Sequence, residues 1–244
     1  MIVMRYANDG NLLSYLDKNI NKLTWKMKLE LLEKIANHLW VIHKVDLVHS
    51  DLHGGNIVLC HKKGDDAQSS EPFVCDLGLS KSVDSSSTSS DSNSIVQGVL
   101  AYIAPEVFHT RKFTRESDIY AFGMIMHLIA DGKQPFRNNL FDKHLARDIC
   151  NGLRPIAPES APEPYKKLAK QCCDANPEAR PTVERLQAYI NSLIQELNGD
   201  ESGDDVWNTI HSNENIEPLL RDEKEDKYSS KVLPTNDLPK PRNS

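Results

Sequence analysis

Residues 49–60 read HSDLHGGNIVLC, a polar loop that runs straight into a short apolar stretch. The loop carries Asp51 and Asn56, and the apolar residues that follow predict a strand. Gly54 and Gly55 stand just before the asparagine, and their permissive backbones would let Asn56 turn back toward the aspartate. The stretch therefore predicts a carboxylate and an amide oxygen that face one space at the entrance of a strand.

A second apolar run, FVCDLG at residues 73–78, reaches another carboxylate at Asp76. Two such runs with a polar connection between them predict a small β-hairpin. Two carboxylates and an amide oxygen suit Mg²⁺, which prefers oxygen ligands and is usually shared with phosphates. One of the carboxylates must stay available to handle a proton. These residues favour half of a phosphoryl-transfer site over the simpler alternative, a polar turn with helix or strand caps.

Helical patterns dominate the rest of the chain. Thr24 is expected to cap a helix whose apolar residues recur every three or four positions. The stretch ESDIYAFGMIMHLIADG is apolar nearly all round, which predicts a buried helix that ends at Gly132. Further helices are expected at about 139–151 and 162–173, and a last one is expected to start at RPTVERL, with Pro181 near its first turn and apolar residues up to Leu197. The predicted fold class is mainly α with a small β-hairpin.

Composition narrows the function classes. The chain has 244 residues, 39% of them hydrophobic and 26% charged, as expected of a globular protein. It contains no apolar run of the roughly 18 to 20 residues that a membrane helix needs. The N-terminus lacks the features of a signal peptide, and the odd number of cysteines, five, fits reduced thiols. These features predict a cytoplasmic protein without a membrane segment.

The net charge of −6 is concentrated in residues 199–244, which carry eleven acidic and six basic residues. No basic face emerges elsewhere, so nucleic-acid binding is not expected. The segment is polar and contains several prolines, which predicts a disordered acidic tail after a domain that ends near Asn198. A serine-rich tract at 85–94 is expected to be a mobile loop. No apolar stripe is left over to indicate an oligomeric state.

Five motifs together resemble the protein kinase family. HSDLHGGN, which contains Asp51 and Asn56, is similar to HRDLxxxN, and DLG at 76–78 is similar to DFG. The third motif, APE, stands at 104–106. A DxxxFG pattern runs from Asp118 to Gly123, and RPT occupies 180–182. Each motif is weak alone, but five in the family's order are specific. The resemblance covers residues 1–198 and implies a protein-kinase-like large lobe.

The resemblance implies a role for each residue of the site. Asp51 would be the catalytic base, and Asn56 and Asp76 would hold Mg²⁺. ATP would be the phosphoryl donor and a protein hydroxyl the acceptor. The opening stretch would be the hinge that contacts the nucleotide. Its expected contacts are the gatekeeper Met4, the backbone of Arg5 and Ala7 at the adenine, Asn11 near the ribose, and Val58 on the adenine floor.

Other matched residues are expected to be structural. Glu106 and Arg180 would form a buried ion pair. Asp118 would anchor the catalytic-loop backbone, and His49 and Leu77 would belong to a packed spine. His53 stands where many family members carry a lysine, and it is either a weaker phosphate contact or an exposed loop histidine.

The implied organisation has three parts. Residues 1–10 would be the end of the small-lobe sheet and the hinge, and residues 11–198 the large lobe. The lobe would contain the catalytic loop 49–56, the metal loop 76–78 and the activation segment 76–106. Residues 199–244 would be the tail.

The chain also departs from the family pattern. It lacks a GxGxxG loop and a VAIK-like lysine, so the small lobe is expected to be truncated. Loss of about 100 Å² of apolar contact would weaken ATP binding by about 2.5 kcal/mol. Ser50 replaces the usual arginine, which implies no clamp on a phosphorylated activation segment, and Val99 leaves only a lean toward Ser/Thr substrates.

Three functions therefore remain open. The first is a protein kinase domain that is weakly active or inactive as given. The second is a pseudokinase or regulatory scaffold. The third is a small-molecule phosphotransferase, because HSDLHGGN also resembles the HGDLHPGN loop of aminoglycoside and choline kinases.

Overall fold

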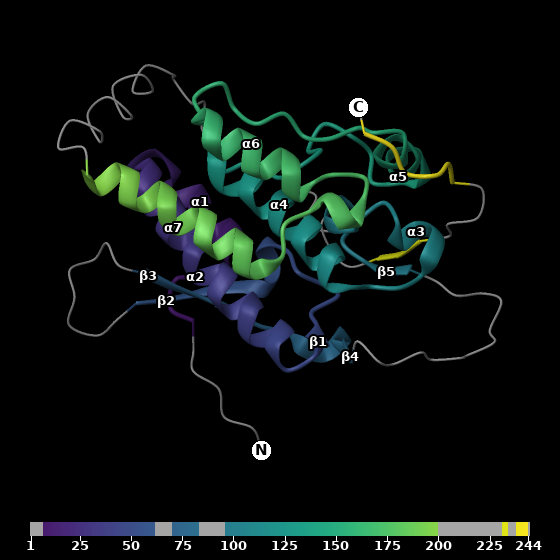
Figure 1. Ribbon diagram of the computed structural model, residues 1–244, viewed down its shortest axis with the longest axis horizontal. Coiled ribbons are helices and arrows are strands. Elements are labelled where there is room, and N and C mark those ends of the chain that lie inside the picture. The colour runs from purple at the N-terminus through teal and green to yellow at the C-terminus, as the bar shows by residue number, and fades with distance from the viewer. Residues whose placement is uncertain (1–6, 62–69, 83–95, 200–230, 234–237, 244) are drawn as a thin grey trace.

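An almost entirely buried helix, α4 (Arg115–Asp131), lies at the centre of the fold (Figure 1). Every residue from Ser117 to Ala130 is buried, as the all-round apolar sequence predicts. Thr114 and Ser117 form a capping box at its start, and Gly132 ends it in the left-handed conformation with φ +75°. The computed structural model describes residues 7–61, 70–82, 96–199, 231–233 and 238–243.

Helices pack around α4 to form a continuous apolar core. α2 begins after Thr24, whose hydroxyl accepts a hydrogen bond from the Met27 amide, and it lies against α7 and the strand β3. α6 packs against α4 itself. The bounds of the helices are α1 Leu12–Asn19, α2 Trp25–Lys44, α3 Val107–Thr110, α5 Lys143–Cys150, α6 Glu163–Cys172 and α7 Val183–Gly199.

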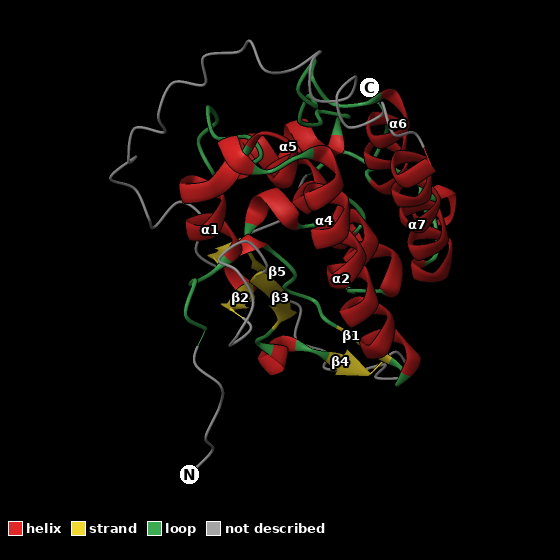
Figure 2. Cartoon of the chain, turned by 90° about the vertical axis from the view of Figure 1, so that its left-hand side faces the viewer, coloured by secondary structure: helices red, strands yellow, loops and turns green. Residues whose placement is uncertain are grey.

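The strands form antiparallel pairs that gather on one side of the helices, as Figure 2 shows. β2 (Ile57–His61) and β3 (Ser70–Val74) make the predicted hairpin, with Ile57 opposite Val74. Two smaller pairs join β1 (Leu47–Val48) to β4 (Lys81–Ser82) and β5 (Val96–Gly98) to β6 (Lys231–Leu233). The mainly α architecture with a small hairpin is thus confirmed.

Some predicted boundaries were wrong. α5 begins at Lys143, later than predicted, because Asp142 caps it by accepting hydrogen bonds from the amides of His144 and Leu145. The last helix begins at Val183, within the RPTVERL stretch as predicted, and Pro181 stands just before its first turn. The helix α1 was not predicted.

The prediction of a disordered tail is wrong for two parts of it. Residues 231–233 pair with β5, and residues 238–243 hydrogen-bond to the ends of α3 and α5 and to the loop after α6. The serine tract 85–94 lies outside the described residues. In the described part of the chain, no helix combines the length and apolarity needed to cross a bilayer.

Candidate active site

A single buried carboxylate, Asp118 of α4, holds the start of the catalytic loop. Its two oxygens accept hydrogen bonds from the backbone amides of His49 and Ser50, at 2.8 and 3.0 Å. The oxygen that accepts from His49, Oδ2, also lies 2.9 Å from Nε2 of His43 on α2. Ser50 has a left-handed backbone with φ +69°, a strained conformation that the Asp118 contact helps to hold. The central helix α4 therefore fixes the backbone of the loop that leads to Asp51.

His49 joins the catalytic loop to the metal loop. Its ring is fully buried, and Nε2 lies 3.1 Å from the carbonyl oxygen of Cys75, the residue before Asp76. Nδ1 accepts a hydrogen bond from the Asp51 amide, so the ring proton belongs on Nε2, where it is donated to Cys75. The Cys75 amide in turn donates to the carbonyl of Asn56 at 2.9 Å. The backbones that carry all three oxygen-bearing residues are thus tied together.

His53 faces the Asp51 carboxylate. The Gly55 amide donates to His53 Nδ1 at 3.0 Å, which leaves the ring proton on Nε2, and Nε2 lies 3.7 Å from Asp51 Oδ2. The two side chains are only 13% and 9% exposed. His53 is therefore not the exposed loop histidine of the second alternative. Whether it contacts phosphate stays a prediction.

The two glycines of the loop lie where a Cβ atom would clash with neighbouring side chains. A Cβ on Gly54 would lie 2.6 Å from Leu128 Cδ2 and 2.8 Å from Leu13 Cδ2, and one on Gly55 would lie 2.7 Å from the His53 ring. Neither glycine has a positive φ. The expectation that permissive backbones explain these glycines is therefore wrong: Gly54 lets the loop pack on α4, and Gly55 leaves room for the histidine.

The donor set around the loop fits a magnesium ion. Asn56 Nδ2 donates to the Asp51 backbone carbonyl at 2.9 Å and approaches Asp51 Oδ2 at 3.5 Å, which turns the amide oxygen of Asn56 away from Asp51. Asp76 is exposed, and its Oδ1 accepts a hydrogen bond from the Gly78 amide. Two carboxylates and one amide oxygen suit a hard cation that also takes phosphate oxygens. The described residues contain no cluster of three His, Cys, Asp or Glu that would favour another metal.

The metal loop is held less firmly than the catalytic loop. Asp76 itself has a left-handed backbone with φ +61° and starts a single 3₁₀ turn, Leu77–Leu79. Leu77 is 47% exposed. The prediction that Leu77 is packed in a spine is therefore wrong within the described residues, whereas His49, its expected partner, is fully buried.

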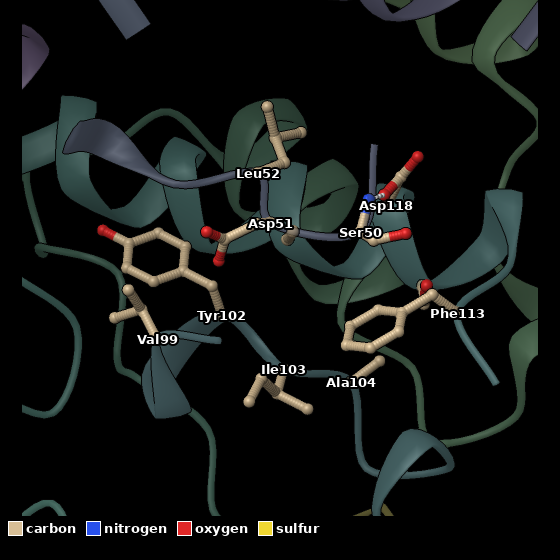
Figure 3. Close-up of a pocket in the computed structure, with 11 residues that line it drawn as sticks. Ser50, Asp51, Leu52, Val99, Tyr102, Ile103, Ala104, Phe113 and Asp118 are labelled. Carbon is tan, nitrogen blue, oxygen red and sulfur yellow. Dashed lines mark hydrogen bonds between the residues drawn. The ribbon is translucent and has the colours of Figure 1, made fainter. Parts of the chain in front are cut away.

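A cavity lies between the catalytic loop and the segment 99–104 (Figure 3). Asp51 and Leu52 line one wall, and Val99, Tyr102 and Ile103 line the opposite wall. In Figure 3 the Asp51 carboxylate lies beside the Tyr102 ring, on the side of the loop away from Asp118. An acceptor group that enters between these walls would meet the Asp51 carboxylate.

The segment 99–106 is anchored to the end of the domain by Glu106 and Arg180. The guanidinium donates to both carboxylate oxygens of Glu106 at 2.7 Å, and the Arg180 side chain is fully buried. It also donates to the backbone carbonyls of Asp174 and Glu116. A buried bidentate pair with its remaining donors satisfied makes a rigid support for the wall opposite Asp51.

The expected nucleotide contacts lie at the edge of the hairpin. The Asp9 amide donates to the Leu59 carbonyl, and the Leu59 amide donates to Gly10, so residues 9–11 run beside β2. Asn11 pairs with Val58 in an isolated bridge, but its side chain caps α1 by accepting from Ser14. Ala7 is half-buried, and its carbonyl accepts from Gly10. Met4 and Arg5 lie outside the described residues.

Sequence reasoning missed two residues of the site. Gly98 has φ +149°, and a Cβ on it would lie 3.5 Å from Asp51 Oδ1. Tyr102 donates a hydrogen bond to Gln134, and its ring centroid lies 5.9 Å from that of His53. The only sequence signal was their position just before the APE motif, in the part of the chain expected to receive substrate.

Comparison with known proteins identifies the family. Residues 1–190 match the family model described as protein tyrosine and serine/threonine kinase. A serine/threonine-protein kinase/receptor of Acanthamoeba polyphaga mimivirus is 28% identical over 200 residues, which cover 79% of this chain and 11% of that protein. An LRR receptor-like serine/threonine-protein kinase of Arabidopsis thaliana is 29% identical over 213 residues, 80% of this chain and 18% of the relative.

A third relative, the serine/threonine-protein kinase roco8 of Dictyostelium discoideum, is 31% identical over 199 residues, or 79% of this chain and 10% of roco8. The chain thus spans between about a tenth and a fifth of the length of these relatives. The family match extends over more than three quarters of the chain and includes the catalytic loop, the metal loop and the Glu106–Arg180 pair. The chain belongs to the protein tyrosine and serine/threonine kinase family.

Proposed function

We propose that the site transfers the terminal phosphoryl group of ATP to a serine or threonine hydroxyl of a protein, with Asp51 as the catalytic base. The observation that carries the proposal is the loop anchored by Asp118, because it holds the Asp51 carboxylate at the wall of a cavity. A base fixed in this way can accept a hydrogen bond from an incoming hydroxyl and take its proton during transfer.

Asn56 and Asp76 are the residues that would hold Mg²⁺. Bound there, the ion would neutralise negative charge on the phosphates that it shares with these side chains. The hydrogen bond from Asn56 Nδ2 to Asp51 fixes the amide so that its oxygen is presented to the ion. A proton on His53 Nε2 would face Asp51, because that nitrogen lies 3.7 Å from Asp51 Oδ2.

The adenine of ATP would lie against the hairpin. Val58 is half-buried on β2 and stands beside residues 9–11, which supports its role as part of the adenine floor. The backbone of Ala7 would meet the adenine edge, and Met4 and Arg5 complete the proposed hinge contacts. Since the sequence contains no glycine-rich loop or strand lysine, nucleotide binding by this chain is expected to be weak.

The serine/threonine preference is supported by the names of the relatives, all three of which are described as serine/threonine-protein kinases. The acceptor would be a protein, because these relatives are named as protein kinases and the Glu106–Arg180 pair anchors the segment that forms the wall opposite Asp51. This wall argues against the small-molecule phosphotransferase. The five free cysteines support a cytoplasmic location, where thiols stay reduced.

The test compares the full 244-residue chain with two variants that make the same chemical change. Asp51→Asn removes the base, and Asp17→Asn alters an exposed carboxylate on α1. Transfer of labelled phosphate from Mg·ATP to a generic acceptor protein should fall by about 10²- to 10⁴-fold in Asp51→Asn and stay unchanged in Asp17→Asn. Equal transfer by the wild type and Asp51→Asn would overturn the proposal.

Nucleotide binding separates the proposal from the scaffold alternative. Calorimetric titration with ATP, with and without Mg²⁺, should show binding that depends on the ion and on Asp76. Magnesium-dependent binding without any transfer would favour a pseudokinase. Binding that ignores both Mg²⁺ and Asp76→Asn would remove the magnesium site.

A further inference from the structure

The C-terminal segment of the chain lies on the strand that borders the active site. β6 (Lys231–Leu233) pairs antiparallel with β5 (Val96–Gly98), and Lys231 stands opposite Gly98. Gly98 is also the residue whose Cβ would lie 3.5 Å from Asp51 Oδ1. One end of the paired strands therefore reaches the glycine beside the proposed base.

A second part of the same segment is anchored away from the active site. The Leu238 carbonyl lies 2.7 Å from His109 Nε2 at the end of α3, and the Leu238 side chain packs against the core. The Arg242 amide and Nε donate to the carbonyls of Cys150 and Asn151, at 3.0 and 3.2 Å. These carbonyls belong to the last turn and C-cap of α5, where no amide further along the helix is available to donate to them.

Asn243 completes the anchor. Its Oδ1 accepts from the Ala175 amide at 2.7 Å, and its Nδ2 donates to Asp174 Oδ1 at 3.0 Å. Asp174 is also the residue whose carbonyl accepts from Arg180. Residues 238–243 thus connect α3, α5 and the loop that supports the Glu106–Arg180 pair, and they begin five positions after the end of β6 in the sequence.

The β5 edge suits an extended peptide. Adding a strand to a sheet edge binds a peptide through main-chain hydrogen bonds, which any sequence can make. Because β5 continues directly into residues 99–104, a peptide on this edge would be guided toward the cavity that Asp51 lines. A protein acceptor that presents its hydroxyl to Asp51 and the chain's own tail would therefore need the same edge.

We propose that β6 and residues 238–243 compete with the protein substrate within the same chain: β6 occupies the β5 edge beside Asp51, and residues 238–243 keep it there. The proposal rests on the proposed function. The paired residues Lys231, Val232 and Leu233 contain no hydroxyl, so they fill the edge without offering an acceptor. Attachment to the same chain gives the segment an effective concentration on the order of 1 mM, which a separate substrate must overcome.

The experiment releases the anchor in the full chain. Leu238→Asp with Arg242→Pro removes the apolar contact, the Arg242 amide donor and its guanidinium, and Arg242→Ala removes only the guanidinium contact. Lys240→Ala, an exposed position in the same segment, is the matched control. A shared unfolding midpoint for all variants checks that each one folds.

Amide exchange and peptide binding test, without relying on activity, whether β6 occupies the β5 edge. Amide exchange of residues 96–104 should rise at least 10-fold in the double variant, less in Arg242→Ala and not at all in Lys240→Ala. A labelled peptide with the sequence of residues 228–244 should bind the double variant at least 10-fold more tightly than the wild type. Unchanged exchange and unchanged peptide binding would overturn the proposal.

Kinetics test the competition. In the double variant the KM for a generic acceptor protein should fall about 10-fold, with kcat and the KM for ATP unchanged. An unchanged acceptor KM in an active preparation would overturn the proposal, and so would phosphate on Ser229 or Ser230, which would make the tail a substrate. If no variant transfers phosphate, the proposed function fails while exchange and peptide binding still decide whether the tail holds the edge.

Discussion

The catalytic loop and the metal loop are neighbours in space but differ in how they are held. The catalytic loop receives hydrogen bonds from the buried Asp118 and packs Gly54 against α4. The metal loop places Asp76 and Leu77 at the surface and is joined to the catalytic loop through the Cys75 backbone. From this difference we expect that α4 fixes the half of the site proposed to handle the proton, and that the half proposed to bind the metal contributes little to the stability of the fold.

The strongest test of this contrast is Asp118→Ala. The change leaves two buried amides and His43 without their acceptor, so the free energy of unfolding should fall by about 4 kcal/mol. Urea unfolding measures it, with Asp17→Ala as the control at an exposed position. A loss below about 1 kcal/mol would show that the loop is held by other contacts.

Low pH should reduce the free energy of unfolding through His127 on α4. Burial lowers the pKa of His127 to about 4, and its Nδ1 has no hydrogen-bond partner among the described residues. Below the ordinary pKa of about 6.5 the unfolded chain takes up a proton that the folded chain refuses until about pH 4. Stability should therefore fall by roughly 3 kcal/mol as the pH drops through this window, and be pH-independent above it as far as this group is concerned.

His127→Leu should flatten that acid limb, as measured by urea unfolding at pH 7, 5.5 and 4.5. The exposed His144→Leu is the matched change and should leave the limb in place. If both variants behave alike, the pH dependence arises elsewhere.

The two glycines sharpen the contrast within the loop itself. Gly54→Ala puts a methyl group into the Leu13 and Leu128 side chains, which should cost about 1 to 3 kcal/mol of unfolding free energy. Gly55→Ala meets only the His53 ring, which can turn aside, so stability should change less while magnesium-dependent ATP binding and transfer suffer more. Equal stability losses would mean that the His53 ring is as fixed as the core.

Asp76→Asn should have the smallest effect on folding. The side chain is exposed, and within the described residues it accepts a hydrogen bond from Gly78 of its own turn, so the unfolding free energy should stay within about 0.5 kcal/mol of the wild type. Magnesium-dependent ATP binding should nevertheless be lost. A destabilisation comparable to that of Asp118→Ala would erase the distinction between the two loops.

Sequence alone was sufficient for the features that depend on local pattern. Periodicity over short windows predicts the buried helix α4 and the hairpin of β2 and β3. The spacing of Asp51 and Asn56 in the same way indicates the catalytic loop. The pairing of residues 96–98 with 231–233 could not be predicted, because three-residue strands far apart in the chain carry no alternation to detect. Acidic composition also hid the six ordered residues at 238–243.

The positions of individual side chains could be predicted less well from the sequence. Leu77 was expected in a packed spine because DLG resembles the DFG motif, but its burial depends on which residues pack over the metal loop. Gly54 looked like a hinge because glycine permits unusual backbones, whereas its role depends on Leu128, which lies 74 positions further along the chain. Both errors concern contacts between distant segments.

The position of Asp118 has a consequence for synthesis of the chain. Its partners His43, His49 and Ser50 precede it by 75, 69 and 68 residues. A ribosome therefore releases the catalytic loop well before the residue that shapes it, and the strained Ser50 backbone has no anchor until α4 has emerged. Assembly of the loop must wait for this long-range contact, so a pause in translation between residues 56 and 118 would leave the nascent site unformed.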